Sequence, residues 1–320
     1  MTAAALIGPD DIREAARGLD GVAVRTPLMA VPALAELVGF PVYLKLESRQ
    51  PTGAFKLRGA WTALRRLDTE ARSRGVITYS SGNHGQAVAF AAQRMGVRAV
   101  IVMPETAPAA KVSGVKRWGG EAVFAGRTSE DRYARATKLA AEQDLTMIPP
   151  FDHPDIIAGQ ATVGLEIVED LPEVAVVAAP VGGGGLAAGI GAALAAFRPS
   201  AKLVTVEPEG SAALAAALAA GHVVRLERTA SVADGLLPLS VGVLNFAHLK
   251  GRAEPVTVSE SAIVEATRWL YYEQHLVAEP SGAVTTAAIR SGAFVPQGPT
   301  VLVVSGGNVD PSAIEQLPAA

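Results

Sequence analysis

Residues 174–197 read VAVVAAPVGGGGLAAGIGAALAAF, an apolar run that contains one proline and four successive glycines. The run carries no charge and is long enough to cross a bilayer. Pro180 and the glycines Gly182 to Gly185 stand inside it, however, and both residue types destabilise the interior of a helix. The stretch therefore predicts a buried strand, a tight turn and then a helix, and it argues against a membrane partner.

Similar strand-like runs recur along the chain and alternate with alanine-rich stretches of helical length. The helical stretches include residues 85–95, 129–143 and 185–197. Because this alternation is typical of parallel sheets covered by helices, the expected fold class is α/β. The strand-like runs are 42–47, 75–80, 98–104, 121–126, 174–181, 202–208 and 300–307.

Two breaks indicate how the chain divides into domains. One is the stretch from Arg72 to Gly75, and the other is the proline-rich MIPPFDHPD of residues 147–155. We expect these breaks to separate a small α/β domain, residues 75–150, from a large domain made of residues 1–74 and 151–320.

The composition limits what the protein binds. The 320 residues are 49% hydrophobic, enough for a sizeable core, and the formal net charge is -3. Without a basic excess, no nucleic-acid partner is expected. The absence of cysteine excludes a thiol nucleophile, a disulfide and a thiolate metal site. The amino terminus lacks the basic start and apolar core of a signal peptide, so a cytoplasmic location is expected.

The tetraglycine turn predicts a phosphate site. Glycines between a strand and a helix let backbone amides approach an anion, with the helix dipole behind them. No Lys-Ser/Thr pair follows the glycines, so the turn is not a Walker A loop. Gly182, Gly184 and Ala187 also satisfy the dinucleotide pattern G-x-G-x-x-A, and Glu207 ends the next strand. An NAD-dependent dehydrogenase therefore stays open as an alternative from a different class.

A second strand-to-helix loop, in YSSGNHGQAVAFAAQ at residues 79–93, predicts a site for a carboxylate or another oxygen anion. Ser80, Ser81, Asn83 and the amides near His84 supply a dense set of neutral donors at the start of the helix. An ordinary N-cap needs only one such side chain, so the set exceeds what capping requires.

Lys56 and Ser305 complete the pattern. Lys56, in QPTGAFKLRGAWTAL at residues 50–64, is expected at the start of a helix, where the dipole favours the neutral amine that forms Schiff bases. In isolation a surface lysine is the simpler interpretation. Ser305 ends a buried-type strand in VLVVSGGNVD at residues 301–310, where open α/β sheets bind ligands. A ligand that needs a lysine, a phosphate cradle, a carboxylate cradle and one neutral hydrogen-bond partner is an amino acid joined to pyridoxal phosphate.

The sequence resembles the fold type II, or β-family, pyridoxal-phosphate enzymes, and among them the threonine ammonia-lyase, serine dehydratase and serine racemase group. The resemblance implies a two-domain architecture like that of tryptophan synthase β, with twisted, mostly parallel sheets covered by helices. The large domain would bind the cofactor, and the small domain would carry the substrate loop. The motifs are KLESRQPTGAFKLRGA (45–60), SSGNHGQAVA (80–89), MPETAPAAKV (103–112), IAGQATVGLE (157–166), PVGGGGLAAG (180–189), EPSGAV (279–284) and SGGNVD (305–310).

This resemblance implies a set of cofactor-binding residues. Lys56 would form the Schiff base with pyridoxal 5'-phosphate, and Phe55 would lie against the cofactor ring. Asn83 would meet the ring hydroxyl, and Ser305 would face the pyridine nitrogen. The cofactor phosphate would be held by Gly182, Gly183, Gly184 and Gly185.

It also implies substrate-binding residues. The substrate carboxylate would lie among Ser80, Ser81, Asn83 and His84. Lys56 would be the catalytic residue on one face of the substrate, and Ser81 is the position that serine racemase uses as acid/base on the other face. Arg132 aligns with an arginine on the substrate side of the racemase pocket, although a solvated helix arginine beside acidic neighbours is an equally good interpretation.

Three positions bear on a metal and on the polarity of the site. Glu207 matches a cation-liganding carboxylate of serine racemase, so a monovalent or divalent cation is a candidate second ligand. Ala213 stands where that site would want a second carboxylate, which argues against tight divalent binding. Phe151 replaces a polar residue near the cofactor ring.

The hydroxyamino-acid lyases fit the sequence best. His84 after Asn83, the four plain glycines and Leu57 after Lys56 differ from the patterns of cysteine-synthase-like and threonine-synthase-like relatives. The expected activity is a threonine/serine ammonia-lyase that forms 2-oxobutanoate or pyruvate plus ammonia by Schiff-base formation and β-elimination, with serine racemase as the alternative. By resemblance, the enzyme would act as a homodimer on a small hydroxyamino acid.

Overall fold

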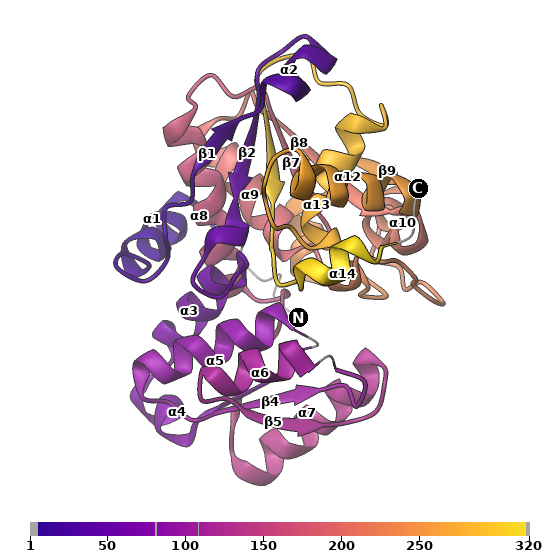
Figure 1. The fold of residues 1–320 in the computed structure, drawn as a ribbon. Coiled ribbons are helices and arrows are strands. Elements are labelled where there is room, and N and C mark those ends of the chain that lie inside the picture. The colour runs from indigo at the N-terminus through magenta and orange to yellow at the C-terminus, as the bar shows by residue number, and fades with distance from the viewer. Residues whose placement is uncertain (1–5, 81, 108, 318–320) are drawn as a thin grey trace.

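The computed structural model describes residues 6–80, 82–107 and 109–317, and Figure 1 shows their path. The strands are β1 (Leu28–Ala30), β2 (Val42–Leu46), β3 (Val76–Tyr79), β4 (Ala99–Met103), β5 (Glu121–Phe124), β6 (Thr146–Met147), β7 (Val176–Pro180), β8 (Lys202–Pro208), β9 (Ala253–Val258) and β10 (Thr300–Val304). The α-helices are α1 (Pro9–Gly18), α2 (Pro32–Val38), α3 (Lys56–Arg66), α4 (Thr69–Arg74), α5 (Asn83–Met95), α6 (Ala109–Arg117), α7 (Ser129–Gln143), α8 (Pro154–Asp170), α9 (Gly185–Phe197), α10 (Ala213–Ala220), α11 (Val243–Leu249), α12 (Glu260–Tyr272), α13 (Pro280–Arg290) and α14 (Pro311–Glu315). Short 3-10 turns are η1 (Glu47–Arg49), η2 (Glu209–Ser211) and η3 (Asp234–Leu236).

Two sheets form the framework. The larger sheet has the strand order β1-β2-β10-β7-β8-β9, and all its neighbouring pairs are parallel except β1 with β2. The smaller sheet has the order β5-β4-β3-β6 and is parallel throughout. Helices cover both sheets (Figure 1). The expected α/β class with mostly parallel sheets is confirmed.

The strand order places three loops side by side. Strands β2, β10 and β7 are parallel neighbours, with Val42 opposite Thr300 and Thr300 opposite Val176. The carboxyl ends of parallel neighbours meet at the same edge of a sheet, where open α/β sheets bind ligands. The stretch before Lys56 follows β2, the residues from Ser305 follow β10, and the glycine turn follows β7.

Three strands of the structure were not predicted, because their sequences are only weakly strand-like. All seven expected strands are present, and their ends lie close to the predicted ones. The missed strands β1 and β6 span only three and two residues. The third, β9, is an edge strand whose sequence, AEPVTV, contains a proline and is largely exposed, as edge strands allow.

The smaller sheet lies inside the expected small domain. Its strands run from Val76 to Met147. Helix α3, which precedes that domain in sequence, still contributes Ala60 and Leu64 to the hydrophobic cluster that contains Val76. The core of the small sheet therefore reaches across the boundary, and the division at residues 74/75 and 150/151 stays a prediction.

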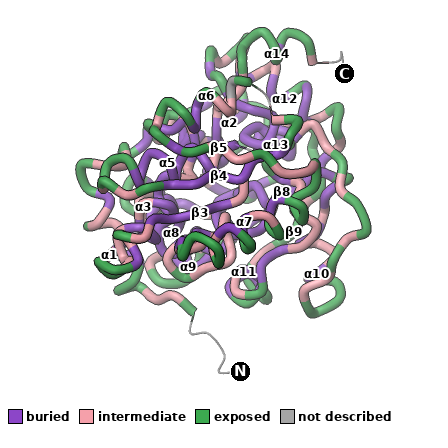
Figure 2. The backbone as a smooth tube through the Cα atoms, turned by 90° about the horizontal axis from the view of Figure 1, so that it is seen from below, coloured by how far each residue is buried: buried purple, intermediate pink, exposed green. Residues whose placement is uncertain are grey.

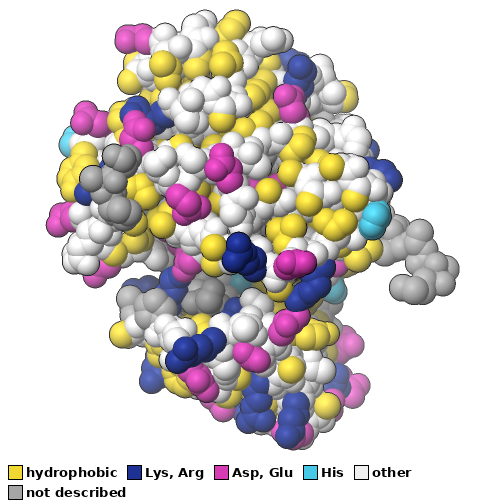
Figure 3. Space-filling model, turned by 90° about the vertical axis from the view of Figure 1, so that its right-hand side faces the viewer, with side chains coloured by type: hydrophobic (Ala, Val, Ile, Leu, Met, Phe, Trp, Pro, Cys, Tyr) yellow, Lys and Arg dark blue, Asp and Glu magenta, His cyan; other side chains and the backbone are white. Residues whose placement is uncertain are grey.

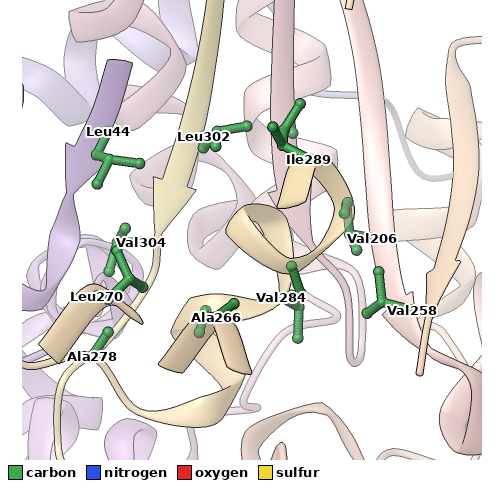
Figure 4. Packing of buried hydrophobic residues seen from close by; sticks show 14 of the residues in the cluster. Leu44, Val206, Val258, Ala266, Leu270, Ala278, Val284, Ile289, Leu302 and Val304 are labelled. Carbon is green, nitrogen blue, oxygen red and sulfur yellow. The ribbon is translucent and has the colours of Figure 1, made fainter. Parts of the chain in front are cut away.

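Two hydrophobic clusters hold the larger sheet between its helices. On one face, side chains of β2, β7, β8 and β10 pack against α12 and α13, as Figure 4 shows for Leu302, Val304 and Ile289. On the other face, Val177 and Val301 pack with residues of α8 and α9. Figure 2 shows buried residues along β3, β4 and β8. Burial on both faces explains why these strands read as continuous apolar runs.

Three helices cross at glycines, and this crossing connects the helix that begins at Lys56 with the helix that follows the glycine turn. A β-carbon on Gly159 of α8 would lie 2.4 Å from the carbonyl oxygen of Arg58 and 2.6 Å from the α-carbon of Gly59, both in α3. A β-carbon on Gly189 of α9 would lie 2.5 Å from the amide nitrogen of Ala161 in α8. Helix α8 therefore packs in backbone contact with α3 on one side and α9 on the other.

The apolar run at residues 174–197 is divided between two elements, as the sequence predicts. Its first part forms β7 and its last part forms α9. Among the residues that the structure describes, no helix is long and apolar enough to span a membrane.

We predict that Gly159→Ala destabilises the protein by about 1–3 kcal/mol, because an added methyl group must push apart two backbones that cannot move independently. Urea unfolding measures the effect. Gly191→Ala in α9 is the matched control, since its β-carbon would meet the ends of two side chains and no backbone, Leu203 at 3.1 Å and Leu249 at 4.0 Å. A Gly159→Ala protein that unfolds at the same urea concentration as the original would contradict the close crossing.

Candidate functional site

Backbone contacts bring the predicted loops together at the edge of the larger sheet. The Phe55 amide donates to the Ser305 carbonyl at 3.0 Å, and the Gly307 amide donates to the Gly53 carbonyl at 2.9 Å. Ala54 and Gly306 form an isolated antiparallel bridge. The lysine stretch and the loop after β10 are therefore held as one unit, because each is the hydrogen-bonding partner of the other.

Lys56 is the first residue of α3, as its sequence context predicts. Its side chain is half-buried, and its Nζ donates to the Pro150 carbonyl at 2.7 Å. Nζ also lies 5.2 Å from the centre of the Phe55 ring. Burial lowers the pKa of Lys56 to about 8, because the ammonium loses hydration in this place. At pH 7 about a tenth of such amines are neutral, several hundredfold more than for an ordinary lysine.

The glycine turn forms an open helix start close to Lys56. Gly184, with φ at +93°, is the N-cap of α9, and the helix has neither a side-chain cap nor an acidic residue in its first turn. A β-carbon on Gly183 would lie 2.2 Å from the ring of Phe151, the residue after the Pro150 that accepts from Lys56. The turn is thus a glycine-lined cradle of the kind that holds a phosphate.

The loop after β3 forms a second open helix start. Helix α5 begins at Asn83 and has no side-chain cap hydrogen bond and no acidic residue in its first turn. The Ser80 hydroxyl accepts from the Gly82 amide at 3.1 Å. Ser81, expected here as a substrate-binding and catalytic residue, lies outside the described residues. The arrangement suits an anionic group such as a carboxylate, because the helix amides and dipole favour negative charge.

His84 is buried behind this loop. Its Nε2 lies 3.2 Å from the Ile148 carbonyl, and its Nδ1 is buried without a hydrogen-bond partner in the described structure. Burial, with the nearby charge of Lys56, lowers the pKa of His84 to about 3. The imidazole therefore stays neutral at physiological pH, with its proton on the nitrogen that faces the carbonyl.

Ser305 and Phe55 border the same place. The buried Ser305 hydroxyl lies 3.5 Å from the Ser281 carbonyl, and Ser305 follows directly on the last residue of β10. Phe55, half-buried, is the N-cap of α3. A neutral hydroxyl and an aromatic face therefore adjoin the amine of Lys56.

Several side chains that surround Asn83 were not predicted as site residues. The Asn83 amide donates to Glu279 at 2.5 Å and accepts from Asn308 at 2.8 Å. Burial and the charge of Asp234 raise the pKa of Glu279 to about 7, while Lys111 and the Asn83 hydrogen bond oppose that rise. The family motifs contain all three residues: EPSGAV contains Glu279, SGGNVD contains Asn308 and MPETAPAAKV contains Lys111. The motifs did not indicate which residues these side chains contact.

Lys111 forms a contact between the smaller lobe, which contains the sheet β5-β4-β3-β6, and the larger lobe, which contains the six-stranded sheet. It comes from α6, forms an ion pair with Asp234 of η3, and lies against Gly82, whose added β-carbon would be 3.0 Å from the Lys111 Cδ. Figure 3 shows the surface hollowed between the two lobes, with charged side chains along both sides. The ion pair thus spans the junction beside the Asn83 loop.

A buried cluster of charges supports α3 from the side opposite Lys56. Arg58 donates to both carboxylate oxygens of Glu47 at 2.8 Å and to Glu166 at 2.6 Å, and Lys45 donates to Glu166 at 2.6 Å. Burial alone would raise the pKa of Glu47, but the charge and hydrogen bonds of Arg58 outweigh it and lower that pKa. Removing one partner of such a buried network leaves an uncompensated charge, which is strongly destabilising.

Two expected site residues are engaged elsewhere. The guanidinium of Arg132 donates to the Arg127 carbonyl at 3.3 Å and to the Ser129 hydroxyl at 2.9 Å, both at the start of its own helix. The buried carboxylate of Glu207 accepts from the amides of Leu214 and Ala215 at 2.7 and 2.8 Å. Burial raises the pKa of Glu207 to about 7, although these hydrogen bonds oppose the rise.

No metal cluster accompanies Glu207 in the described part of the chain. Among those residues, no group of three or more His, Cys, Asp or Glu side chains could hold an ion. The expected roles of Glu207 toward a cation and of Arg132 toward a substrate stay predictions.

Comparison with known proteins identifies the family. Residues 19–306 match the family model described as pyridoxal-phosphate dependent enzyme. The chain belongs to this family. It is 39% identical to the L-threonine ammonia-lyase of Thermotoga maritima over 313 residues, which cover 98% of this chain and 78% of the relative.

Solved structures agree with this assignment. The structure of maize serine racemase superposes with a TM-score of 0.92 at 36% identity, covering 98% of this chain and 97% of the racemase. The crystal structure of the T.th. threonine deaminase superposes with a TM-score of 0.90 at 40% identity, covering 95% of this chain and 99% of the deaminase. The fold type II resemblance is confirmed, and the dehydrogenase alternative raised by the G-x-G-x-x-A pattern is wrong.

The described residues fit the cofactor of this family. The cradle at Gly183 has no room for a β-carbon, α9 has no side-chain cap, and the pKa of Lys56 is lowered to about 8. A phosphate needs the first two features, and an aldehyde needs the amine. Pyridoxal phosphate therefore matches both the chemistry of the donors and the family.

We predict that Lys56 in the cofactor-free protein reacts with an amine-modifying reagent half-maximally near pH 8. Its reactivity rises with pH because the pKa is depressed from its ordinary value of 10.5, so the neutral amine appears as pH passes 8 and is lost as pH falls below it. Mass spectrometry of the Lys56 peptide measures the labelling, and the peptide of exposed Lys138 serves as internal reference for reagent consumption. A midpoint above about pH 10 would rule out the desolvated amine.

Proposed function

We propose that this protein is an ammonia-lyase that uses pyridoxal 5'-phosphate to convert L-threonine, and also L-serine, into 2-oxobutanoate or pyruvate plus ammonia. The observation that carries the proposal is the half-buried Lys56 amine, whose pKa is lowered to about 8, beside two helix starts without side-chain caps. The similarity to relatives named L-threonine ammonia-lyase and threonine deaminase supports this reaction class.

Different residues around Lys56 would bind different parts of the cofactor. The amides of Gly182 to Gly185 would hold the cofactor phosphate at the start of α9, and Phe55 would cover the ring. Asn83 would donate to the ring hydroxyl, and Ser305 would face the ring nitrogen. Bound in this way, pyridoxal phosphate supplies an electron sink for the electron pair left on the α-carbon of the substrate.

Substrate binding would fall to the second helix start. The backbone amides at the start of α5, including those of Asn83 and His84, would form with the Ser80 hydroxyl a neutral donor set for the substrate carboxylate. Ser81 belongs to the same proposal but lies outside the described residues. A carboxylate bound here would hold the substrate with its α-hydrogen facing Lys56, so the amine could remove that hydrogen from a substrate in a fixed position.

Proton transfer would then depend on Lys56. A neutral amine whose pKa lies near the working pH is an effective general base for the α-hydrogen. Ser305 would present a neutral hydroxyl to the ring nitrogen; such a partner would not hold that nitrogen protonated, which would favour loss of the β-hydroxyl. Phe151, packed on Gly183, makes this edge of the site less accessible to water.

Serine racemase is the second candidate, and the similarity to maize serine racemase favours it. Racemisation needs an acid/base on each face of the substrate, whereas elimination needs Lys56 and a protonated leaving oxygen. Ser81 is the proposed second group. The apolar Phe151 favours the lyase, because a drier site hinders reprotonation and suits the methyl group of threonine. The homodimer, the cytoplasmic location and the assisting cation are further proposals.

We expect 2-oxobutanoate to form from L-threonine faster than D-serine forms from L-serine. Measuring the 2-oxoacid and the chiral amino-acid products with each substrate decides between the two activities. D-serine that outpaces total 2-oxoacid would show that racemisation is the main reaction. Ser81→Ala is expected to suppress racemisation more than it suppresses cofactor binding, since the hydroxyl acts on the substrate.

Lys56→Ala tests the base itself. We expect this variant to lose activity by on the order of 10³-fold, because general base catalysis contributes that much. Its unfolding midpoint in urea is the control for folding. Activity within about tenfold of the original in a folded Lys56→Ala protein would overturn the proposed role.

A further inference from the structure

The side-chain amide of Asn83 is held at both ends by residues of the larger lobe. Its Oδ1 accepts from Nδ2 of Asn308 at 2.8 Å, and its Nδ2 donates to Oε1 of Glu279 at 2.5 Å. Asn308 follows β10, and Glu279 is the N-cap of α13, whereas Asn83 begins α5 beside the smaller sheet. The amide therefore lies where the two lobes meet.

The hydrogen bonds of Asn308 determine which way the Asn83 amide points. Nδ2 of Asn308 donates to the carbonyl of Thr52 at 2.8 Å as well as to Asn83. A backbone carbonyl only accepts, so the group of Asn308 that faces it must be the NH₂. The same NH₂ faces Asn83, which must therefore present its oxygen to Asn308 and its own NH₂ to Glu279.

This orientation leaves one N–H of Asn83 without a described protein partner. An NH₂ group carries two donors, and Glu279 takes one of them. If the amide were turned over, its oxygen would face Glu279, and above the pKa of about 7 of that carboxyl two acceptors would oppose each other. The second N–H is thus available to a ligand only while Asn308 holds the Asn83 amide with its oxygen toward Asn308 and its NH₂ toward Glu279.

We propose that Asn308 is a positioning residue that keeps the free N–H of Asn83 directed at the cofactor. The inference rests on the proposed function, in which Asn83 donates to the ring hydroxyl of pyridoxal phosphate. Asn308 acts through Asn83 and does so from the same loop that carries Ser305, two residues beyond Gly306.

Gly53 makes the contact with Asn308 sterically feasible. It adopts φ of +72°, and an added β-carbon would lie 2.2 Å from Oδ1 of Asn308. Only glycine takes this conformation readily and also leaves the space. The Asn308 amide therefore reaches the loop that leads into Lys56, so one side chain connects the lysine loop, the Asn83 loop and the strand that ends before Ser305.

Asn308→Asp separates orientation from packing. Aspartate has the shape of asparagine, so a purely space-filling role would make this change milder than Asn308→Ala. An ionised aspartate only accepts, however, and it would face the Thr52 carbonyl and the Asn83 oxygen, both acceptors. Turning the Asn83 amide over to satisfy the introduced carboxylate would set the Asn83 oxygen against Glu279, so aspartate should be the more damaging change.

The experiment measures the dissociation constant of pyridoxal phosphate at pH 8, where Glu279 is mostly ionised, by titrating the cofactor-free protein and following the absorbance of the bound form. We expect Asn308→Asp to weaken binding about 10- to 100-fold and Asn308→Ala less than about tenfold, as loss of one or two hydrogen bonds implies. Asp310→Asn, in the exposed cap of α14, is the matched control and should bind as the original does. Urea unfolding of each cofactor-free variant reports on folding.

A double-mutant cycle tests whether Asn308 acts through Asn83. In an Asn83→Ala background, Asn308→Asp should change the dissociation constant less than about twofold, because the residue it positions is gone. Full additivity of the two changes, or Asn308→Ala proving as harmful as Asn308→Asp, would overturn the inference alone. Asn83→Ala binding pyridoxal phosphate as the original does would overturn both the proposed role of Asn83 and the inference.

Discussion

The close crossing of α3, α8 and α9 is the constraint on which the site depends. Lys56 begins α3, and the glycine turn begins α9. Helix α8 lies between these two helices and is in backbone contact with both. The contact at Gly159 leaves no room for a methyl group. Because close-packed backbones do not shift independently, the amine and the phosphate cradle are fixed relative to each other by packing that lies outside the site.

Electrostatics at Lys56 follow from the same packing. The helix start and the loss of water both disfavour the ammonium, while Glu47 and Glu166 pair with Arg58, two residues further along α3. Arg58 is two residues after Lys56, about 200° around the helix, so its charge and its partners lie on the opposite side. The cluster anchors the helix without providing a counter-ion to the amine, which lets the pKa fall.

The other half of the site comes from a different lobe, and side chains connect the two. Asn83 reaches Glu279 and Asn308, and Lys111 reaches Asp234. The free donor for the cofactor ring would therefore come from the smaller lobe, while the groups that orient that donor come from the larger one. Cofactor binding and the relative position of the lobes are thereby coupled through one amide.

The sequence by itself determined most of the elements and the residue types present in each loop. The strands at 174–181 and 300–307 are apolar because both faces of a parallel sheet are buried, and glycine, serine and asparagine mark the turns that follow them. Lys56, the glycine turn, the Asn83 loop and Ser305 could be named because local context restricts the residue types that work there. The resemblance then named the cofactor, which the family match confirms.

Only the tertiary structure decided which residues act on one another. Glu279 and Asn308 are separated from Asn83 by 196 and 225 residues, and Arg132 and Glu207 are bound to groups at nearby helix starts. The edge strand β9 was missed for a related reason, since pairing with β8 and not local composition stabilises it. Hydrogen bonds and desolvation depend on distances in space, and a linear pattern contains no distance between residues that are far apart along the chain.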